Sequence, residues 1–307
     1  MDMSSTPIFD AAGTAGLIPF RALADALKTA AADYAAGRVA SPERLVVPLN
    51  DNGIMLSMPA AASDLAIHKL VNVCPRNGER ALPTIHGQVM AFDADTGKTL
   101  FILDGPTVTG RRTAAMTMLG IETLSRTAPK DILLIGTGTQ AANHLQAIGE
   151  LYPDARVRVR GTSAARAQAF CDAQRGKARD LQPLAGAATP DSVDVVIALT
   201  TSRQAVYDEA PRAQRLVIGV GAFTPQMCEI GARTLTGSAL YVDDLAGAKH
   251  EAGDFIQAGI DWSTVTGIKD ALAKPPSFDQ PVVFKTVGCA AWDLAAGRVA
   301  RAALGAG

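Results

Sequence analysis

The segment that most constrains the fold of this chain is an apolar run that leads into a glycine-rich turn and then a helix. The run covers 130–136, and the turn places Gly136, Gly138 and Ala141 in the spacing G-x-G-x-x-A. Two glycines let the backbone turn tightly and approach a pyrophosphate, and a small third residue lets the helix pack closely on the strand. The N-terminus of the next helix, Gln140–Leu151, favours bound phosphate. The segment therefore predicts a dinucleotide site, with an ordinary glycine-rich turn as the alternative.

Strands and helices alternate on both sides of this motif. A helix is expected over Thr107–Thr123 before it, and a strand over Arg156–Arg160 and a helix over Ser163–Gln174 after it. Such alternation indicates a parallel sheet with helical crossovers. Later apolar runs lack alternation between polar and apolar residues, which is typical of strands covered on both faces. We therefore expect these runs to be further strands of the same sheet. These runs are Val193–Leu199, Leu216–Val220, Leu240–Val242 and Val282–Val287.

The first 105 residues follow a different pattern, which predicts an antiparallel α+β lobe. Apolar residues at spacings of three and four indicate a helix from Pro19 to Ala36 that ends at Gly37. Strand-like segments then come in pairs around turn sequences. The pairs are Arg44–Leu49 with Ile54–Met58 and Gln88–Asp93 with Thr99–Leu103.

These patterns together predict an α/β protein of two domains. A Rossmann-type parallel sheet domain is expected over 121–287, and the antiparallel lobe over 1–120 and 288–307. Prolines at 275, 276 and 281 interrupt the chain before its last strand-like run. The closing helix, Ala290–Leu304, is therefore expected to fold back on the first lobe.

Composition narrows the class of protein. The chain has 307 residues, 48% of them apolar and 19% charged, which is typical of a folded, soluble protein. A net charge of -1 without any basic run argues against a nucleic-acid or membrane surface. The four cysteines and four histidines are scattered, so we expect a reducing cytoplasm and no metal site. Residues 1–10 lack the basic and apolar regions of an export signal, and no membrane-spanning stretch is expected.

The residues after the second strand of the Rossmann pattern indicate which cofactor is bound. Folds that prefer NAD usually carry an acidic residue there for the ribose hydroxyls. This chain has no carboxylate between Ala155 and Cys171. Four residues capable of binding a 2′-phosphate occupy the stretch instead, namely Arg160, Thr162, Ser163 and Arg166. NADPH is therefore the expected cofactor, and NADH remains open if these are ordinary solvated residues.

Two cations, those of Lys69 and Arg112, are candidates for binding a carboxylate. Lys69 shares a strand face with Ile67 and Val71, so its ammonium points into apolar surroundings. A buried lysine needs a partner, which here is either a structural salt bridge or a ligand carboxylate or imine. Arg112 lies on an apolar helix face, so it too needs either a structural partner or a ligand carboxylate. Its neighbour Arg111 is expected to be exposed. Arg44, judged by its own sequence context, is expected to be solvated.

The order of these features resembles the ornithine cyclodeaminase/mu-crystallin family over nearly the whole chain. The motifs that carry the resemblance are short, and their combination is specific. They are Ser57–Ala60, Lys69 with Asn72, Leu82–Thr84, Asp104–Gly105, Arg111–Ala115, Gly136–Ala141 and Val283–Gly288. The resemblance implies a homodimer in which each chain has a Rossmann domain and an antiparallel substrate-binding and dimerisation lobe. It also implies action on α-imino acids with a nicotinamide cofactor.

The resemblance, taken together with the patterns above, implies roles for several residues. Arg44, Lys69 and Arg112 would hold the substrate carboxylate, with Lys69 also a candidate proton donor, and Val287 and Phe223 would lie against the substrate. His86 is the other candidate donor, although a structural histidine is favoured. The residues expected at the cofactor are Thr84, Arg112, Gly136, Gly138, Thr139, Gln140, Arg160, Thr162, Ser163, Arg166, Thr200, Gly221 and Thr286.

One departure from the family pattern points to a particular reaction. Family cyclodeaminases carry an aspartate in a stretch like GxDxPGKxEL that acts as a base, and this chain has Phe223 there and Met227 at the lysine position. Imine reduction needs no such base. The resemblance thus implies a reductase of Δ1-pyrroline-2-carboxylate and Δ1-piperideine-2-carboxylate. An alanine or N-alkyl amino acid dehydrogenase, an ornithine cyclodeaminase and a non-catalytic NADPH-binding protein are the alternatives.

Overall fold

The computed structural model describes residues 5–305 of the chain. Residues 1–4, on which the expectation of no export signal partly rests, and residues 306–307 of the predicted lobe lie outside this range. The chain divides into two compact units. Unit 1 holds the residues up to Thr113 and those from Cys289 onward, and unit 2 holds Ala114–Gly288. The division falls inside the helix α3 (Gly105–Leu124).

Unit 1 is built on a five-stranded antiparallel sheet in the order β1-β2-β3-β4-β5. Each strand is joined to the next by a short connection, so neighbours in sequence are neighbours in the sheet. The strands are β1 (Leu45–Pro48), β2 (Ile54–Ala61), β3 (Leu65–Val73), β4 (Ile85–Asp93) and β5 (Thr99–Asp104), with 3-10 turns at Asn50–Asn52 and Pro75–Arg80. Both predicted strand pairs are thereby confirmed.

Besides the first part of α3, unit 1 contains three helices: α1 (Ala11–Leu17), α2 (Phe20–Ala35) and α10 (Ala290–Ala303). α10 packs on α2 and across β2 and β3, which confirms that the closing helix returns to the first lobe. Gly297 makes this approach possible, because a Cβ there would lie 3.1 Å from the side chains of Ile67 and Leu65 on β3. The ring of Trp292 meets that of Tyr34 on α2 edge to face, with centroids 5.9 Å apart.

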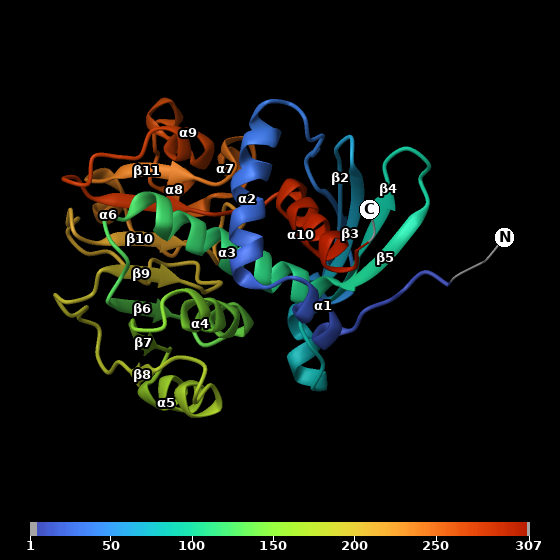
Figure 1. Ribbon diagram of the computed structural model, residues 1–307. Coiled ribbons are helices and arrows are strands. Elements are labelled where there is room, and N and C mark those ends of the chain that lie inside the picture. Colours follow the sequence, from blue (N-terminus) through green and yellow to red (C-terminus); the bar gives the residue numbers. More distant parts are fainter. Residues whose placement is uncertain (1–4, 306–307) are drawn as a thin grey trace. The chain divides into compact units, whose positions relative to one another are not determined.

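Unit 2 contains an eight-stranded parallel sheet, and Figure 1 labels several of its strands. The order is β12-β11-β13-β10-β9-β6-β7-β8. The bounds are β6 (Asp131–Ile135), β7 (Arg156–Arg160), β8 (Asp180–Pro183), β9 (Val195–Ala198), β10 (Leu216–Gly219), β11 (Ala239–Val242), β12 (Thr266–Gly267) and β13 (Val282–Lys285). The predicted class, a parallel Rossmann-type sheet with a separate antiparallel sheet, is confirmed.

The order of this sheet reverses between β6 and β9. From β6 the chain proceeds outward through β7 to β8, and it then crosses back to β9 on the other side of β6. Ligands of such sheets bind at the carboxyl ends of the strands beside this reversal. The glycine-rich turn after β6 lies at that position.

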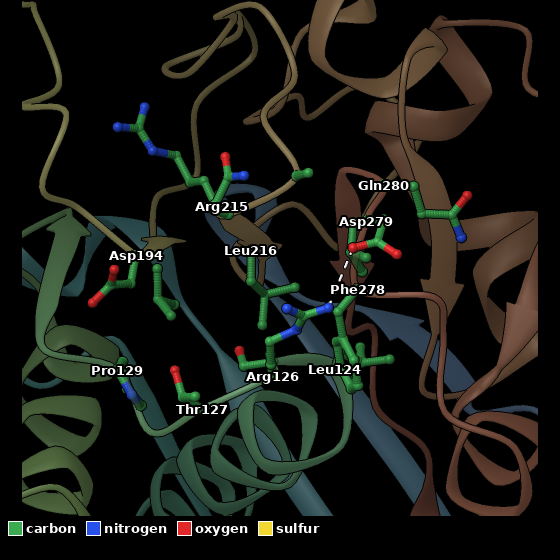
Figure 2. Close-up of a pocket in the computed structure, with 15 residues that line it drawn as sticks. Leu124, Arg126, Thr127, Pro129, Asp194, Arg215, Leu216, Phe278, Asp279 and Gln280 are labelled. Carbon is green, nitrogen blue, oxygen red and sulfur yellow. Dashed lines mark hydrogen bonds and ion pairs between the residues drawn. The ribbon is translucent and has the colours of Figure 1, made fainter.

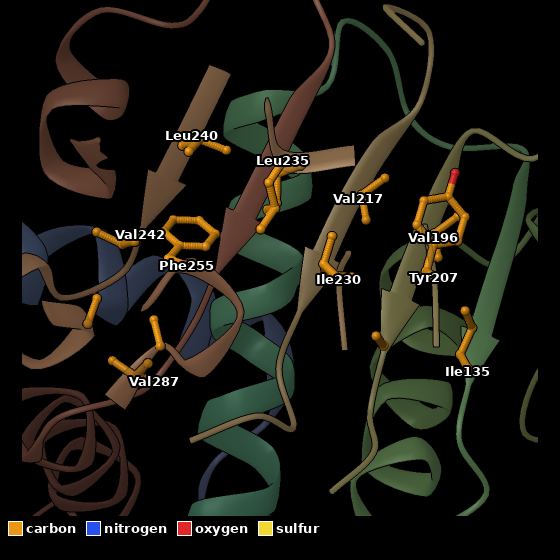
Figure 3. Packing of buried hydrophobic residues seen from close by; sticks show 14 of the residues in the cluster. Ile135, Val196, Tyr207, Val217, Ile230, Leu235, Leu240, Val242, Phe255 and Val287 are labelled. Atoms are coloured by element: carbon orange, nitrogen blue, oxygen red, sulfur yellow. The ribbon is translucent and has the colours of Figure 1, made fainter. Parts of the chain in front are cut away.

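The core of unit 2 packs helices against this sheet. Figure 3 shows apolar side chains of β6, β9, β10 and β11 grouped with Phe255 of α8. β6, β9, β10 and β13 are buried at every position, which explains why their sequences lack polar alternation. The helices are α4 (Thr139–Leu151), α5 (Ala164–Ala173), α6 (Ala232–Thr236), α7 (Leu245–Glu251), α8 (Gly253–Gln257) and α9 (Ile268–Ala273), with a 3-10 turn at Trp262–Thr264. No helix within 5–305 is long and apolar enough to cross a membrane.

Candidate active site

The turn after β6 has the geometry of a pyrophosphate cradle. Gly136 has φ +130°, and a Cβ there would lie 2.7 Å from the carbonyl oxygen of Leu199, so the position accepts only glycine without movement of the loop after β9. At Gly138 the position of a Cβ is open, with no heavy atom within 4 Å. Ala141 is fully buried, which is the close helix packing that a small third residue allows. The backbone can therefore approach a ligand closely at Gly138.

The N-terminus of α4 is directed at this open space. Gly138 is the N-cap, and no side chain caps the first turn, so N–H groups of Thr139 and Gln140 have no side-chain acceptor at the cap. Exposed amide donors and the positive end of the helix dipole together favour a phosphate. The residues present thus fit the pyrophosphate of a dinucleotide.

A buried histidine fixes α4 to α3. His144 Nδ1 lies 2.8 Å from the carbonyl oxygen of Gln140 and Nε2 lies 2.9 Å from Thr117 Oγ1. The carbonyl only accepts, so Nδ1 carries the proton and Nε2 accepts from the hydroxyl. Burial lowers the pKa of His144 to about 4, and the ring is neutral at pH 7. The helix whose N-terminus forms the cradle is held by a neutral imidazole.

The four residues predicted to select the cofactor do not all point the same way. Arg166 lines an open depression with Gly138 and Thr139, beside the cradle. Arg160 is turned to the loop before β9, where Nη2 donates to the carbonyl oxygen of Ala188 at 3.1 Å. Ser163 is the N-cap of α5 and accepts from the Arg166 amide, and Thr162 is exposed. Arg166 is thus the cation that the structure brings next to the glycine-rich turn.

The loops after β9 and β10 are tied together by a buried carboxylate. Glu229 accepts from the amides of Thr200, Gly221 and Ala222. Burial raises the pKa of Glu229, and the charge of Lys285 opposes this shift. Gly221 lies so close to Thr200 that a Cβ would come within 2.0 Å of its carbonyl oxygen. The two predicted cofactor residues Thr200 and Gly221 are therefore brought together.

Two further buried groups support the same loops. Asp254 on α8 accepts from the amides of Glu229 and Ile230, and its other oxygen lies 3.1 Å from Lys285 Nζ. Lys285 is 0% exposed and stands at the end of β13. The carboxyl ends of β9, β10 and β13 are thus braced through one ammonium and two carboxylates.

The end of β13 carries the next predicted residues. Thr286 is buried and its amide donates to the carbonyl oxygen of Gly219. The amides of Val287 and Gly288 both donate to Asp243, each at 2.9 Å. Phe223 is half-buried in the loop after β10. Thr286, Val287 and Phe223 all lie at the carboxyl edge of the sheet of unit 2.

Lys69 and Arg112 of unit 1 meet on one carboxylate. Lys69 Nζ donates to Asp293 Oδ2 at 2.6 Å, and Arg112 Nε donates to Oδ1 at 3.1 Å. Asp293 and Lys69 are 0% and 2% exposed. The structural salt bridge considered for Lys69 is therefore present, and its partner is a residue that the sequence patterns did not single out.

The charges in this cluster shift the pKa values of its members. Burial lowers the pKa of Lys69 to about 8; the charges of Arg112 and Arg44 act in the same direction, and Asp293 acts against them. Burial alone would raise the pKa of Asp293, but the neighbouring cations hold it below its ordinary range. Arg44 is half-exposed and near enough to affect Lys69. The three predicted carboxylate-binding cations thus share one electrostatic environment.

Three other residues of unit 1, Arg111, Thr84 and His86, were also assigned positions or roles from the sequence. Arg111 was expected to be exposed, and this is wrong. Its Nε donates to the carbonyl oxygen of Ile18 at 2.9 Å and its guanidinium lies 3.8 Å from the ring centroid of Phe20. Because Arg111 and its neighbour Arg112 are both buried, α3 is covered on two sides, whereas the apolar stripe in its sequence predicted one covered side.

Thr84 lies just before β4, His86 lies on β4, and both are exposed. His86 is therefore not a buried structural histidine.

The sequence patterns missed the carboxylates that organise the site: Asp243, Glu229, Asp254 and Asp293. All four are buried, and none belongs to a sequence motif that marks it as functional. An isolated carboxylate in an apolar helix, such as Asp293 between Trp292 and Leu294, is the signal that could have identified one of them, because it needs a buried cation.

A separate cavity of about 380 Å³ lies at the opposite edge of the parallel sheet (Figure 2). Its lining residues precede strands, among them Pro129 before β6, Asp194 before β9 and Gln280 before β13. Its charged groups already have protein partners, as Arg126 has in Asp279. Dinucleotides bind at the carboxyl ends of such strands, so this cavity is not the expected cofactor site.

Comparison with known proteins finds relatives in both sequence and structure. A Δ1-pyrroline-2-carboxylate/Δ1-piperideine-2-carboxylate reductase of Azospirillum brasilense is 60% identical over 304 residues, 99% of this chain and 98% of the relative. The structure of Thermococcus litoralis Δ1-pyrroline-2-carboxylate reductase in complex with NADH and L-proline matches with a TM-score of 0.88 at 22% identity, over 97% of each chain. An archaeal alanine dehydrogenase dimer with bound NAD matches with a TM-score of 0.86 at 23% identity, over 97% of this chain and 95% of the other.

The family model for ornithine cyclodeaminase/mu-crystallin proteins matches residues 8–305, a range that includes all of unit 2, most of unit 1 and every site residue named above. The chain therefore belongs to the ornithine cyclodeaminase/mu-crystallin family.

Proposed function

We propose that this protein is an NAD(P)H-dependent reductase of cyclic α-imino acids, which converts Δ1-pyrroline-2-carboxylate to L-proline and Δ1-piperideine-2-carboxylate to L-pipecolate. The observation that carries the proposal is the 60% identity, over 99% of the chain, with a reductase named for these two substrates. Unit 2 offers a dinucleotide cradle and unit 1 offers buried cations for a carboxylate, which are the two things that this reaction requires.

The cofactor supplies the hydride when it is bound. The amides at the start of α4, together with Gly136 and Gly138, would hold its pyrophosphate. Thr200, Gly221 and Thr286 lie at the carboxyl ends of β9, β10 and β13, where the nicotinamide half of a dinucleotide is bound in sheets of this type. The task of these residues is to orient the ring and to exclude water around it.

The residues of unit 1 would bind the substrate carboxylate and supply a proton. Arg112 commits Nε to Asp293, so its terminal guanidinium nitrogens would face the carboxylate of the substrate, with Lys69 and Arg44 beside it. Reduction adds a hydride to the ring carbon and a proton to the ring nitrogen. Lys69, whose pKa is lowered to about 8, can release a proton near neutral pH and recover it from water.

NADPH is the cofactor that we propose as preferred. Arg166 lies beside the cradle, and the stretch from Ala155 to Cys171, which includes β7 and the turn after it, has no acidic residue to repel a 2′-phosphate. Arg160, Thr162 and Ser163 lie at the same strand end. A guanidinium pairs well with phosphate oxygens, and a 2′-phosphate would supply them.

A second copy of the chain is the partner that we propose. β1 is the edge strand of the unit 1 sheet, and its side chains Leu45, Val46 and Val47 are 63%, 50% and 40% exposed. Exposed apolar edge strands are usually covered in a native assembly. The archaeal alanine dehydrogenase with the same fold is a dimer.

The experiment that tests the function measures oxidation of NADPH and NADH with four candidate substrates. These are Δ1-pyrroline-2-carboxylate, Δ1-piperideine-2-carboxylate, and pyruvate with ammonia or with methylamine. We expect the two cyclic imines to give the highest kcat/KM. A higher value with pyruvate and an amine would make the protein an alanine or N-alkyl amino acid dehydrogenase, and no oxidation with any of them would make it a binding protein.

A further inference from the structure

We propose that Asp293 is a positioning residue for the reaction, which holds Lys69 and Arg112 on its two carboxylate oxygens and keeps Lys69 protonated for substrate binding and proton transfer. This inference rests on the proposed function for its chemical meaning. The geometry that it uses lies wholly within unit 1.

Asp293 is held in place by contacts on both sides along α10. In the first turn of that helix the amide of Ala291 donates to the hydroxyl of Ser41, at 3.2 Å, in the segment that leads to Arg44. Later in the helix Arg298 forms an ion pair with Asp64, at 2.6 Å, in the turn between β2 and β3. The close packing of Gly297 on β3 fixes the depth of the helix. The carboxylate is thus presented to Lys69 by a rigid element.

Each oxygen of the Asp293 carboxylate has its own cation. Oδ2 accepts from Lys69 Nζ and Oδ1 accepts from Arg112 Nε, so the two cations are kept apart by the width of one carboxylate. Both cations are nearly fully buried, and neither would keep this spacing without a shared anion. A substrate carboxylate that binds to the same two cations needs them at a fixed separation.

The second role of Asp293 is to keep Lys69 protonated. The charged groups that face Lys69 are Asp293 from α10, Arg112 from α3 and Arg44 from the segment before β1. Burial and the two guanidinium groups favour a neutral lysine, and Asp293 alone among them favours the ammonium. Without this carboxylate, three cationic side chains would face one another in apolar surroundings, and Lys69 would lose its proton first.

A neutral Lys69 would be unable to perform the reaction. The C=N bond gains a hydride at carbon from the reduced nicotinamide and a proton at nitrogen, so one proton is consumed for each hydride transferred. The ammonium of Lys69 can supply this proton, which leaves a neutral amine that takes a proton back from water. An amine without charge neither pairs with the substrate carboxylate nor supplies the proton. Asp293 thereby controls the pH at which the enzyme stops working.

The test replaces Asp293 with asparagine, which keeps the shape of the side chain and removes its charge. We expect the alkaline fall of kcat/KM to move to lower pH by roughly 1 to 3 units in D293N. The resonance of Lys69 labelled at Cε, assigned by its absence in K69M, should titrate at a correspondingly lower pH. The KM for the imine should rise at neutral pH while the KM for NADPH stays near that of the wild type.

Asp131→Asn is the matched control. Asp131 is a buried carboxylate that is 4% exposed and forms an ion pair with Arg158 at 2.9 Å in unit 2. We expect D131N to lower the free energy of unfolding and to leave both the alkaline limb and the Lys69 titration in place. A purely structural role for Asp293 would make D293N behave like this control, and that result would overturn the inference.

Two further outcomes are distinguishable. If the wild type oxidises neither NADPH nor NADH with a cyclic imine, the proposed function fails, whereas the Lys69 titration in D293N still decides the role of Asp293. If D293N does not fold, Asp293→Glu keeps the charge and displaces the carboxylate by one methylene. We expect D293E to retain the alkaline limb and to raise the KM for the imine; an unchanged KM would contradict the positioning role.

Discussion

At the scale of single residues, Lys69 carries the chemistry that we assign to unit 1. Replacement by methionine keeps much of the apolar stem and removes the ammonium that pairs with a carboxylate. A charge-assisted hydrogen bond is worth roughly 1.5 to 3 kcal/mol. We therefore expect K69M to lower kcat/KM for cyclic imines on the order of ten- to a hundredfold.

The wild-type rate should also depend on the protonation of Lys69. Because the pKa of Lys69 is lowered to about 8, activity is expected to be complete below that pH and to fall as pH rises through it. The exposed Lys98 in the turn between β4 and β5 provides the control, since K98M removes a lysine far from any buried partner. Equal losses in K69M and K98M would contradict the role given to Lys69.

We expect side chains at and after the end of β7 to decide the cofactor preference. Replacing Arg166 with alanine should raise the KM for NADPH and leave that for NADH nearly unchanged, because only NADPH carries the phosphate that a guanidinium would bind. Arg160→Ala should show a smaller effect of the same kind, since Arg160 already donates to Ala188. Arg175→Ala, which removes an exposed arginine just beyond α5, is the control. A wild-type kcat/KM that is equal or higher with NADH would refute the preference.

The sequence could identify the cations of the site but not their partner. Lys69 stands out because the alternation of β3 places it on an apolar face, and this required only local sequence. Asp293 lies 224 residues away, and its pairing with Lys69 depends on how α10 folds back on β3. Glu229 and Asp254 were missed for the same reason, because they bind backbone amides of loops whose positions only the folded chain defines.

At the scale of elements, the joint between α3 and α4 depends on a neutral histidine. His144 has a pKa of about 4 in the folded protein and an ordinary value of 6.5 when unfolded. The depressed value means that the stabilisation is present above pH 6.5 and is lost as pH falls through about 4. This difference corresponds to a loss on the order of 3 kcal/mol.

The measurement is the free energy of unfolding as a function of pH. We expect His144→Gln to be less stable than the wild type at pH 7 and to lose less stability between pH 6.5 and pH 4. The exposed His250→Gln should retain the wild-type pH dependence. If H144Q follows the wild-type curve throughout, the histidine is not buried as a neutral ring.

A clear helical period or a fully apolar run determined whether the sequence revealed an element. Long helices with a clear period, such as α2 and α10, and fully apolar strands such as β6 were predicted to within a few residues. The elements α1, α6, α7, α8 and α9 span five to seven residues, and β8 and β12 span four and two. Helices this short have one or two turns at most, so their sequences show no helical period of apolar residues. Tertiary contacts then decide the conformation of these short helices and strands.

At the scale of the whole molecule, we expect the reaction class to depend on the absence of an acidic residue at position 223. Conversion of ornithine to proline requires hydride removal, loss of ammonia and hydride return, and the middle stage needs a group that moves protons beside the nitrogen. The family's cyclodeaminases are expected to use an aspartate where this chain has Phe223. A half-buried phenylalanine would pack against a flat imine and would leave the second ammonium of ornithine without a counter-charge.

The most direct test of the account compares two reactions of the same purified protein. One is the oxidation of NADPH with Δ1-pyrroline-2-carboxylate, with L-proline identified as the product, and the other is ammonia release from L-ornithine with NAD⁺ or NADP⁺. We predict a rapid imine reduction and no ornithine cyclodeamination above background. Ammonia and proline formed from ornithine at a rate comparable to that of imine reduction would contradict the account.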